Sequence, residues 1–170
     1  MFIIVMGVSG CGKSAVGSRL AEKLDAHYAE GDEFHSKANI EKMRNGIPLN
    51  DDDRWPWLNA IAEAIDDWRT HGRDAVVACS ALKKVYREIL RDGHDDVVFV
   101  HLKGSMDLIA GRMAKRQHEY MPSSLLQSQF DTLEPPDDRT ENSVTVDIAP
   151  PPEAIVETVL DHLREKGTIA

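Results

Sequence analysis

The chain has 170 residues, of which 42% are hydrophobic and 29% are charged, and its formal net charge is −9. This length predicts one domain spanning residues 1–170, with enough residues to bury a core. Lysines and arginines are scattered along an acidic chain, which argues against nucleic acid or an anionic membrane surface as the main partner. No apolar run approaches membrane-spanning length, and two isolated cysteines suit a reducing compartment. We therefore expect a cytoplasmic protein.

The first predicted strand, residues 2–6, leads directly into Gly7-Val8-Ser9-Gly10-Cys11-Gly12-Lys13-Ser14. The spacing G-x-x-x-x-G-K-S is that of the phosphate-binding P-loop, whose backbone N–H groups surround phosphate oxygens. Lys13 would reach the β- and γ-phosphates, and the Ser14 hydroxyl would ligate Mg²⁺. The motif predicts binding of a nucleoside triphosphate, with contacts from Gly7, Ser9, Gly10, Cys11, Gly12, Lys13, Ser14 and Ala15.

Beyond the P-loop, helical and strand patterns alternate. Apolar periodicity predicts a helix over residues 13–24, a short helix over 39–43, and a longer one that begins at the carboxylates 51–53. Continuous apolar runs, typical of strands covered on both faces, occupy residues 75–79 and 97–102. The remaining predicted strands are a short one at 28–29 and a last one at 144–148. The remaining predicted helices pass through Tyr86 and Leu90, cover about 106–116 and 125–133, and begin at Pro152.

This alternation predicts an α/β fold of three layers, in which a five-stranded parallel sheet carries helices on both faces. Ligands of such sheets bind at the carboxyl ends of the strands. Asp32 and Ser80 follow two of the predicted strands. We therefore expect both side chains to share a cleft with the P-loop.

A P-loop occurs in regulatory GTPases, motor ATPases and small-molecule kinases. The guanine-binding sequence Asn-Lys-x-Asp of GTPases is missing, because the expected place reads His101-Leu102-Lys103-Gly104. A motor or AAA-type ATPase needs a strand that ends in acidic residues, whereas residues 75–79 are followed by Ser80-Ala81-Leu82-Lys83. A compact kinase remains, with a substrate-binding segment at about 32–58 and a lid at about 116–124.

Several sequence blocks outside the P-loop identify the kind of kinase. They are Gly31-Asp32-Glu33-Phe34-His35, Asn39-Ile40-Glu41-Lys42-Met43, Gly46-Ile47-Pro48-Leu49, Asp51-Asp52-Asp53-Arg54, Pro56-Trp57-Leu58, Cys79-Ser80-Ala81-Leu82-Lys83 with Tyr86-Arg87, and Met121-Pro122 with Leu125-Leu126 and Ser128-Gln129-Phe130. With these blocks the chain resembles the small P-loop gluconokinases over nearly its whole length, whereas adenylate, guanylate and shikimate kinases share the P-loop but lack the blocks. Two departures are Cys11, where the family usually has Gly or Ser, and His118-Glu119-Tyr120, where it often has His-Phe-(Phe/Tyr).

The resemblance implies transfer of the γ-phosphate of ATP to D-gluconate, with Mg²⁺ bridging the phosphates, in a homodimeric enzyme. Asp32 would contact the attacking hydroxyl, and His35 other substrate hydroxyls. Arg54 would bind the carboxylate, because a guanidinium forms the two-pronged contact that an ammonium cannot. Arg112 and Arg116, four apart on a predicted helix, would neutralise charge on the triphosphate. Ser80, Lys83 and Gln129 complete the expected substrate residues.

Each role has an alternative. Asp32 could cap a helix, Arg54 could pair within the acidic run 51–53, and the arginines could lie on a solvated helix face. The protein could phosphorylate another small polyhydroxy acid or a shikimate-like substrate, or it could bind nucleotide and a partner protein without turnover. A coupled assay of ADP release with a panel of sugar acids separates these functions.

Overall fold

The computed structural model describes residues 1–115 and 125–170, so the predicted lid at 116–124 lies outside the described residues. Within those ranges, parallel strands form a five-stranded sheet in the order β2-β3-β1-β4-β5. The predicted parallel sheet is therefore confirmed. The strands are β1 (Phe2–Met6), β2 (His27–Glu30), β3 (Ala75–Ala78), β4 (Val97–Lys103) and β5 (Ser143–Asp147).

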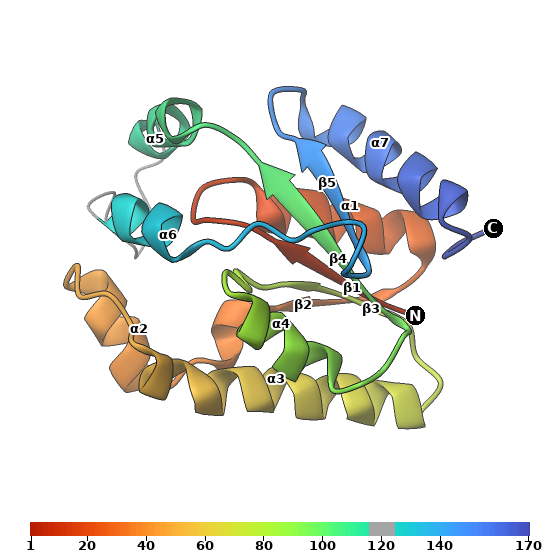
Figure 1. Ribbon diagram of the computed structural model, residues 1–170, viewed down its shortest axis with the longest axis horizontal. Coiled ribbons are helices and arrows are strands. Elements are labelled where there is room, and N and C mark those ends of the chain that lie inside the picture. The colour runs from red at the N-terminus through yellow and green to blue at the C-terminus, as the bar shows by residue number, and fades with distance from the viewer. Residues whose placement is uncertain (116–124) are drawn as a thin grey trace.

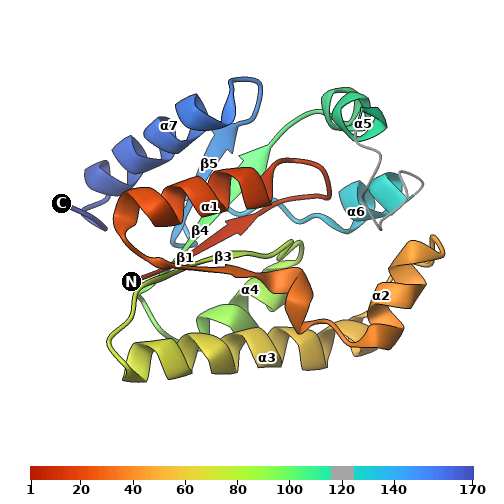
Figure 2. The same ribbon diagram turned by 180° about the vertical axis from the view of Figure 1, so that it is seen from behind.

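Helices cover both faces of the sheet, which confirms the predicted three layers. Helices α1 and α7 lie on one face, and α3 and α4 lie on the other (Figures 1 and 2). Helices α2, α5 and α6 lie around the end of the sheet to which the strand arrows point (Figure 1). The helical bounds are α1 Lys13–Leu24, the 3₁₀ turn η1 Gly31–Phe34, α2 Lys37–Arg44, α3 Asp51–Thr70, α4 Lys84–Arg91, α5 Met106–Ala114, α6 Leu126–Thr132 and α7 Pro152–Glu165. None of the helices in the described ranges is long and apolar enough to cross a membrane.

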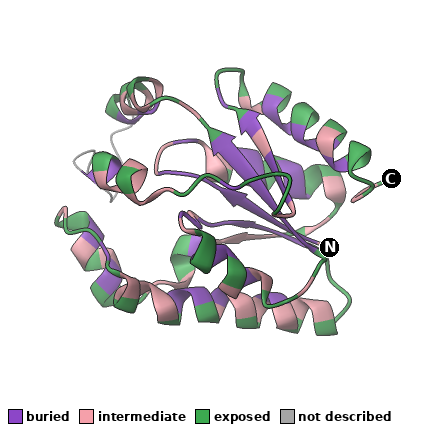
Figure 3. Cartoon of the chain, viewed as in Figure 1, coloured by how far each residue is buried: buried purple, intermediate pink, exposed green. Residues whose placement is uncertain are grey.

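Alternate residues of each strand enter two separate cores, because successive strand side chains point to opposite faces. In β1, Ile3 and Val5 pack with residues of α1 and α7. Phe2, Ile4 and Met6 pack with α3 and α4 in the second core. Burial on both faces explains why β1, β3 and most of β4 have continuous apolar sequences instead of alternating ones (Figure 3).

The helix limits follow local sequence signals closely. Helix α3 begins where Asn50 caps it, and the Asp53 side chain accepts the Asn50 backbone N–H in return, forming a capping box. The predicted helix over 106–116 is shorter in the structure. Helix α5 ends at Ala114, where the Lys115 N–H turns back to the carbonyls of Arg112 and Met113. Arg116 lies outside the described residues.

The register of the sheet aligns the carboxyl ends of β1, β2 and β3. Val5 of β1 and Glu30 of β2 both pair with Ala78 of β3, and Met6 pairs with His101 of β4. The P-loop, η1 and the segment at Ser80 therefore all leave the sheet at the carboxyl ends of the strands. The expectation that they share a cleft rests on this register.

Strand β4 contains a buried histidine, His101, with one ring nitrogen that makes no hydrogen bond to the described residues. His101 is 2% exposed, and its Nδ1 atom has no hydrogen-bond partner among the described residues. Burial lowers the pKa of His101 to about 4, and the positive charge of Arg87 acts in the same direction. His101 is therefore neutral in the folded protein at neutral pH.

The unfolded chain binds a proton at this histidine below pH 6.5, whereas the folded chain does so only near pH 4. The contribution of neutral His101 to stability is complete above pH 6.5 and is lost as the pH falls towards 4. Between pH 6.5 and 4, the unfolding free energy of the wild-type protein should fall by about 3 kcal/mol because of His101. In His101→Leu this part of the fall should be absent. Urea unfolding at several pH values measures this, and an unchanged slope for the variant would contradict it.

Candidate active site

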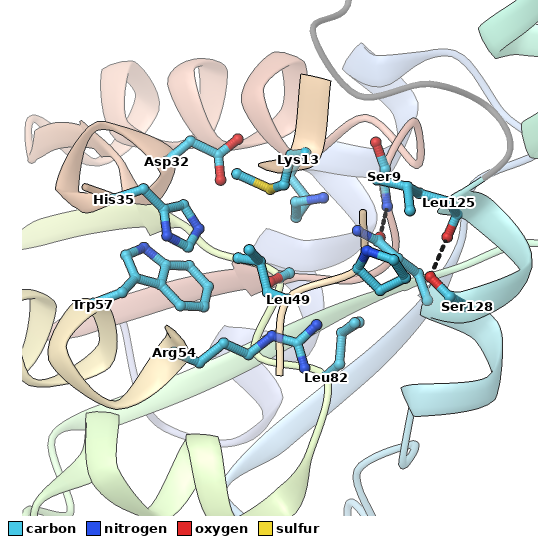
Figure 4. A pocket seen from close by; sticks show the side chains of 14 residues that line it. Ser9, Lys13, Asp32, His35, Leu49, Arg54, Trp57, Leu82, Leu125 and Ser128 are labelled. Atoms are coloured by element: carbon cyan, nitrogen blue, oxygen red, sulfur yellow. Dashed lines mark hydrogen bonds between the residues drawn. The ribbon is translucent and has the colours of Figure 1, made fainter. Parts of the chain in front are cut away.

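A pocket lies at the carboxyl ends of β1, β2 and β3 (Figure 4). The P-loop forms one wall, and η1, α3, α6 and the segment after β3 supply the others. Side chains from these segments converge on the same space, with Lys13 between Asp32 and Ser9 (Figure 4). The structure thus brings together these residues predicted from the sequence: Ser9, Lys13, Asp32, His35, Arg54, Ser80 and Gln129.

The P-loop has the curled backbone that phosphate binding requires. Gly12 precedes α1 at φ +98°, in a left-handed conformation that suits glycine. Helix α1 then begins at Lys13, so its positive dipole end faces the loop. The Lys13 ammonium donates to the carbonyl of Val8 at 3.0 Å, across the loop. Burial raises the pKa of Cys11, so its thiol stays neutral and the residue offers the loop only its backbone N–H.

Asp32 is placed by the turn that follows β2. Gly31 lies so close to β3 that a Cβ atom there would come within 2.5 Å of the Ala78 carbonyl oxygen, so only glycine allows this approach. The Trp57 indole N–H of α3 donates to the Gly31 carbonyl at 2.8 Å. No group in the described chain donates a hydrogen bond to the Asp32 carboxylate. Among the described residues, the protein thus leaves both carboxylate oxygens without a hydrogen-bond donor.

His35 is held as a neutral hydrogen-bond donor beside Asp32. Its ring stacks on Trp57, with centroids 4.1 Å apart. The Asn39 amide nitrogen donates to the Asp53 carbonyl at 2.8 Å and lies 3.3 Å from His35 Nδ1. Because that nitrogen is a donor, Nδ1 accepts and Nε2 carries the proton. Burial lowers the pKa of His35 to about 4 despite the opposing charge of Asp32, and Arg54 lowers it further.

Arg54 extends from the first turn of α3 along the pocket (Figure 4). Its Nη1 donates to the Tyr86 hydroxyl at 2.7 Å, which is the guanidinium's single hydrogen bond within the described part of the chain. The edge formed by Nε and Nη2 is thus not used by a described protein group. Two nearby lysines differ, because Lys42 is paired with Asp53 at 2.9 Å and Lys83 with Asp51 at 3.1 Å.

The remaining predicted substrate residues differ in their placement. Ser80 lines the pocket next to Leu82. Gln129 of α6 accepts a hydrogen bond from the Ser9 backbone N–H at 2.6 Å, so it contacts the P-loop directly. Lys83, in contrast, is not among the lining residues, and its ammonium bonds the Asp51 carboxylate.

A second hollow lies on the other side of the P-loop. It is bounded by the turn Gly10-Cys11-Gly12, by Ala15, by Arg112 and by residues 149–152 after β5. Arg112 Nη2 donates to the Ile148 carbonyl at 2.7 Å, which holds the guanidinium beside this hollow. Arg112 therefore lies on the β4–β5 side of the P-loop, away from Asp32 and Arg54.

Sequence reasoning missed several members of the site. Trp57 is 3% exposed, and its ring lines the pocket and stacks on His35, a role that the sequence analysis did not assign. Asn39 carries no catalytic signature, and only its bond to His35 shows its part in the site. The apolar part of the wall lies within the blocks that carry the family resemblance, but the sequence assigned it no role; it includes Met43, Pro48, Leu49, Leu82 and Leu125.

Residues 3–129 match a family model described as an AAA domain. The chain is 41% identical to the thermoresistant gluconokinase of Escherichia coli strain K12 over 95% of this chain and 93% of that protein. In the solved structures it resembles a gluconokinase from Sinorhizobium meliloti 1021, at 48% identity and a TM-score of 0.84, over 96% of this chain and 91% of that one. It also resembles an unliganded sugar kinase from Janibacter sp. HTCC2649, at 45% identity and a TM-score of 0.91, over 96% and 94% of the two chains.

The family match covers the P-loop and strands β1 to β4. Strand β3 is followed by Cys79 and Ser80, with no acidic side chain at its end, so the chain lacks the acidic residues that a motor or AAA-type ATPase needs there. The three relatives named above cover nearly the whole chain, and each is a gluconokinase or a sugar kinase. The sequence, the fold and the pocket agree with them, and the chain belongs to the gluconokinase family of ATP-dependent P-loop kinases.

Proposed function

We propose that the protein transfers the γ-phosphate of ATP to D-gluconate, giving 6-phospho-D-gluconate and ADP. The position of the Arg54 side chain is the observation that supports this proposal. Its guanidinium lies in the same pocket as Lys13, and the edge formed by Nε and Nη2 makes no hydrogen bond within the described residues. That edge matches the two oxygens of a carboxylate.

The position of Arg54 also selects the reacting hydroxyl. Gluconate is an open chain of six carbons with its carboxylate at one end. A carboxylate held by Arg54 directs the opposite end towards Asp32 and the P-loop, which line the far part of the pocket. The neutral His35 Nε2–H would donate to a hydroxyl along the chain, and Ser80 and Gln129 lie within the same lining.

In the transfer step, the substrate oxygen forms a bond to the γ-phosphorus while the bond from that phosphorus to the bridging oxygen breaks. Asp32 orients the attacking hydroxyl and accepts its proton. Lys13 and the P-loop N–H groups stabilise the charge on the phosphate oxygens. The Ser14 hydroxyl, exposed at the first turn of α1, would hold Mg²⁺, which would supply further neutralisation of the phosphate charge.

The hollow beside Arg112 suits the adenosine part of ATP. Because it adjoins Gly10, Gly12 and Ala15, a nucleotide bound there has its phosphates against the P-loop. Arg112 would then contact the nucleotide and not gluconate. Several expectations from the sequence stay predictions. They are the role of Arg116 and of a lid at 116–124, the single domain over residues 1–170, the homodimer and the cytoplasmic location.

Lys13→Ala should lower turnover of ATP and gluconate by several orders of magnitude, because the ammonium neutralises charge that grows in the transition state. The fold should survive, since Lys13 faces the pocket and not the core. Coupled measurement of ADP release, with circular dichroism as the folding control, checks this. A folded variant with near wild-type turnover would contradict the P-loop assignment.

Arg112→Ala should lower kcat/KM for ATP about tenfold, because a charged contact of this kind is worth roughly 1.5 kcal/mol or more. The KM for gluconate should stay within about twofold of the wild-type value, since Arg112 lies on the other side of the P-loop. Initial rates with each substrate varied in turn provide the test. A change confined to the KM for gluconate would place Arg112 in the substrate site instead.

Arg54→Ala should lower kcat/KM for gluconate at least about tenfold, because a lost charged hydrogen bond costs roughly 1.5–3 kcal/mol and each factor of ten is about 1.4 kcal/mol. Arg54→Lys should recover only part of the loss, since an ammonium cannot make the two-pronged contact. ATP affinity without gluconate should hardly change.

The assay should include a panel of sugar acids and the corresponding neutral sugars. Wild-type protein should prefer the acids, and Arg54→Ala should lose most of that preference. If ATP binding fell as much as gluconate turnover, Arg54 would belong to the nucleotide site or to the fold.

A further inference from the structure

Arg54 depends on a neighbour to hold its guanidinium in the pocket. An arginine side chain has several rotatable bonds, and fixing it when a ligand arrives weakens binding. Its hydrogen bond to Tyr86 joins Nη1, the group outside the Nε–Nη2 edge, so the bond positions the guanidinium without using that edge. The Arg54 Cζ atom also lies 5.4 Å from the centroid of the Tyr86 ring.

Tyr86 is the fixed member of this contact. Tyr86 is 1% exposed and packs in the core between the sheet and helices α3 and α4. Trp55 meets the ring edge-on, with centroids 5.7 Å apart and planes at 77°. This packing holds the ring where its hydroxyl contacts both Arg54 and Asp51.

The direction of the hydrogen bonds follows from the groups involved. A tyrosine hydroxyl has one proton, a guanidinium can only donate, and an ionised carboxylate can only accept. The Tyr86 hydroxyl therefore donates to Asp51 Oδ1 at 2.5 Å and accepts from Arg54. Hydrogen bonds from Tyr86 and then Lys83 lower the pKa of Asp51, which keeps the acceptor ionised.

Lys83 completes this chain of contacts at the start of α4. Its ammonium lies 3.1 Å from Asp51 Oδ1 and 3.4 Å from Oδ2. Asp51 is the first residue of α3 and Lys83 precedes α4, so the pair joins the beginnings of the two helices. Asp51 is thereby bound from two sides, and the Tyr86 proton has a fixed acceptor.

We propose that Tyr86 and Asp51 are positioning residues that hold Arg54 in its carboxylate-binding orientation, with Lys83 anchoring Asp51. The proposal rests on the proposed function, because it assigns to Arg54 the carboxylate of the substrate. It also changes the role expected for Lys83, which acts through Asp51 and not by touching gluconate. The affinity for the sugar acid is then set partly by two residues that do not contact it.

Tyr86→Phe tests the proposal because phenylalanine keeps the packed ring and removes only the hydroxyl. We expect the KM for gluconate to rise about three- to tenfold, the range associated with ordering one long side chain on binding. The KM for ATP and the thermal midpoint should hardly change. Asp51→Asn should raise the KM for gluconate in the same direction, since a neutral acceptor holds the hydroxyl less firmly. An unchanged KM in either variant would overturn that residue's role.

A double-variant cycle separates positioning from general loosening. In the Arg54→Ala background, Tyr86→Phe should change kcat/KM for gluconate by less than about twofold, because the group it positions is gone. Independent, multiplying losses would overturn the proposal. Arg54→Ala that left gluconate turnover intact would instead refute the role of Arg54 itself, and with it the positioning roles.

Lys42→Met is the matched control. Lys42 pairs with Asp53 on the same first turn of α3, at 2.9 Å, but makes no contact with Tyr86. It should leave the KM for gluconate near the wild-type value, whereas Lys83→Met should raise it. Equal effects of the two lysine variants would show that loosening of α3 is sufficient, and would overturn the proposal.

Discussion

The curl of the backbone between β1 and α1 is the constraint on which the rest of the site depends. Strand β1 lies in the middle of the sheet, with β3 and β2 on one side and β4 and β5 on the other. A loop that leaves the central strand has a pocket on each side of it. The pocket with Asp32 and Arg54 lies towards β2 and β3, and the hollow with Arg112 lies towards β4 and β5. Within the described residues, the P-loop is the one segment that borders both hollows, which suits transfer of a phosphoryl group between ligands bound in them.

Charge pairing explains how an acidic chain offers cations to anionic ligands. Two of the three carboxylates that precede Arg54 in sequence are engaged elsewhere, Asp51 by Tyr86 and Lys83, and Asp53 by Lys42 and the α3 cap. The pairing of Arg54 within its own acidic run is therefore not what the structure shows. The lysines near α3 are neutralised, whereas Arg54 and Lys13 donate to uncharged oxygens, a hydroxyl and a carbonyl. Local pairing, and not the net charge, decides where an anion binds.

The sequence predicted the elements whose signals are local. Helix α1 has its expected bounds because Gly12 and Asp25, both with left-handed backbone, close its two ends. The clustering of Asp32 and Ser80 near the P-loop followed from parallel topology alone. Lys83 and Asn39 could not be placed in this way, because Lys83 bonds Asp51, 32 residues away in the chain, and Asn39 is fixed against the Asp53 carbonyl, 14 residues away. Periodicity identifies the buried face of a helix but says nothing about such distant side-chain partners.

The P-loop satisfies two of its donors with the protein's own oxygens. The Ser9 N–H donates to Gln129, and the Lys13 ammonium donates to the Val8 carbonyl. A phosphate oxygen that replaces either acceptor exchanges one hydrogen bond for another, and such an exchange gains little unless the new acceptor is charged. A triphosphate offers charged oxygens, whereas an uncharged ligand does not. The same contacts that keep the loop's polar groups paired thus favour an anionic ligand, and they join α6 to the P-loop through Gln129.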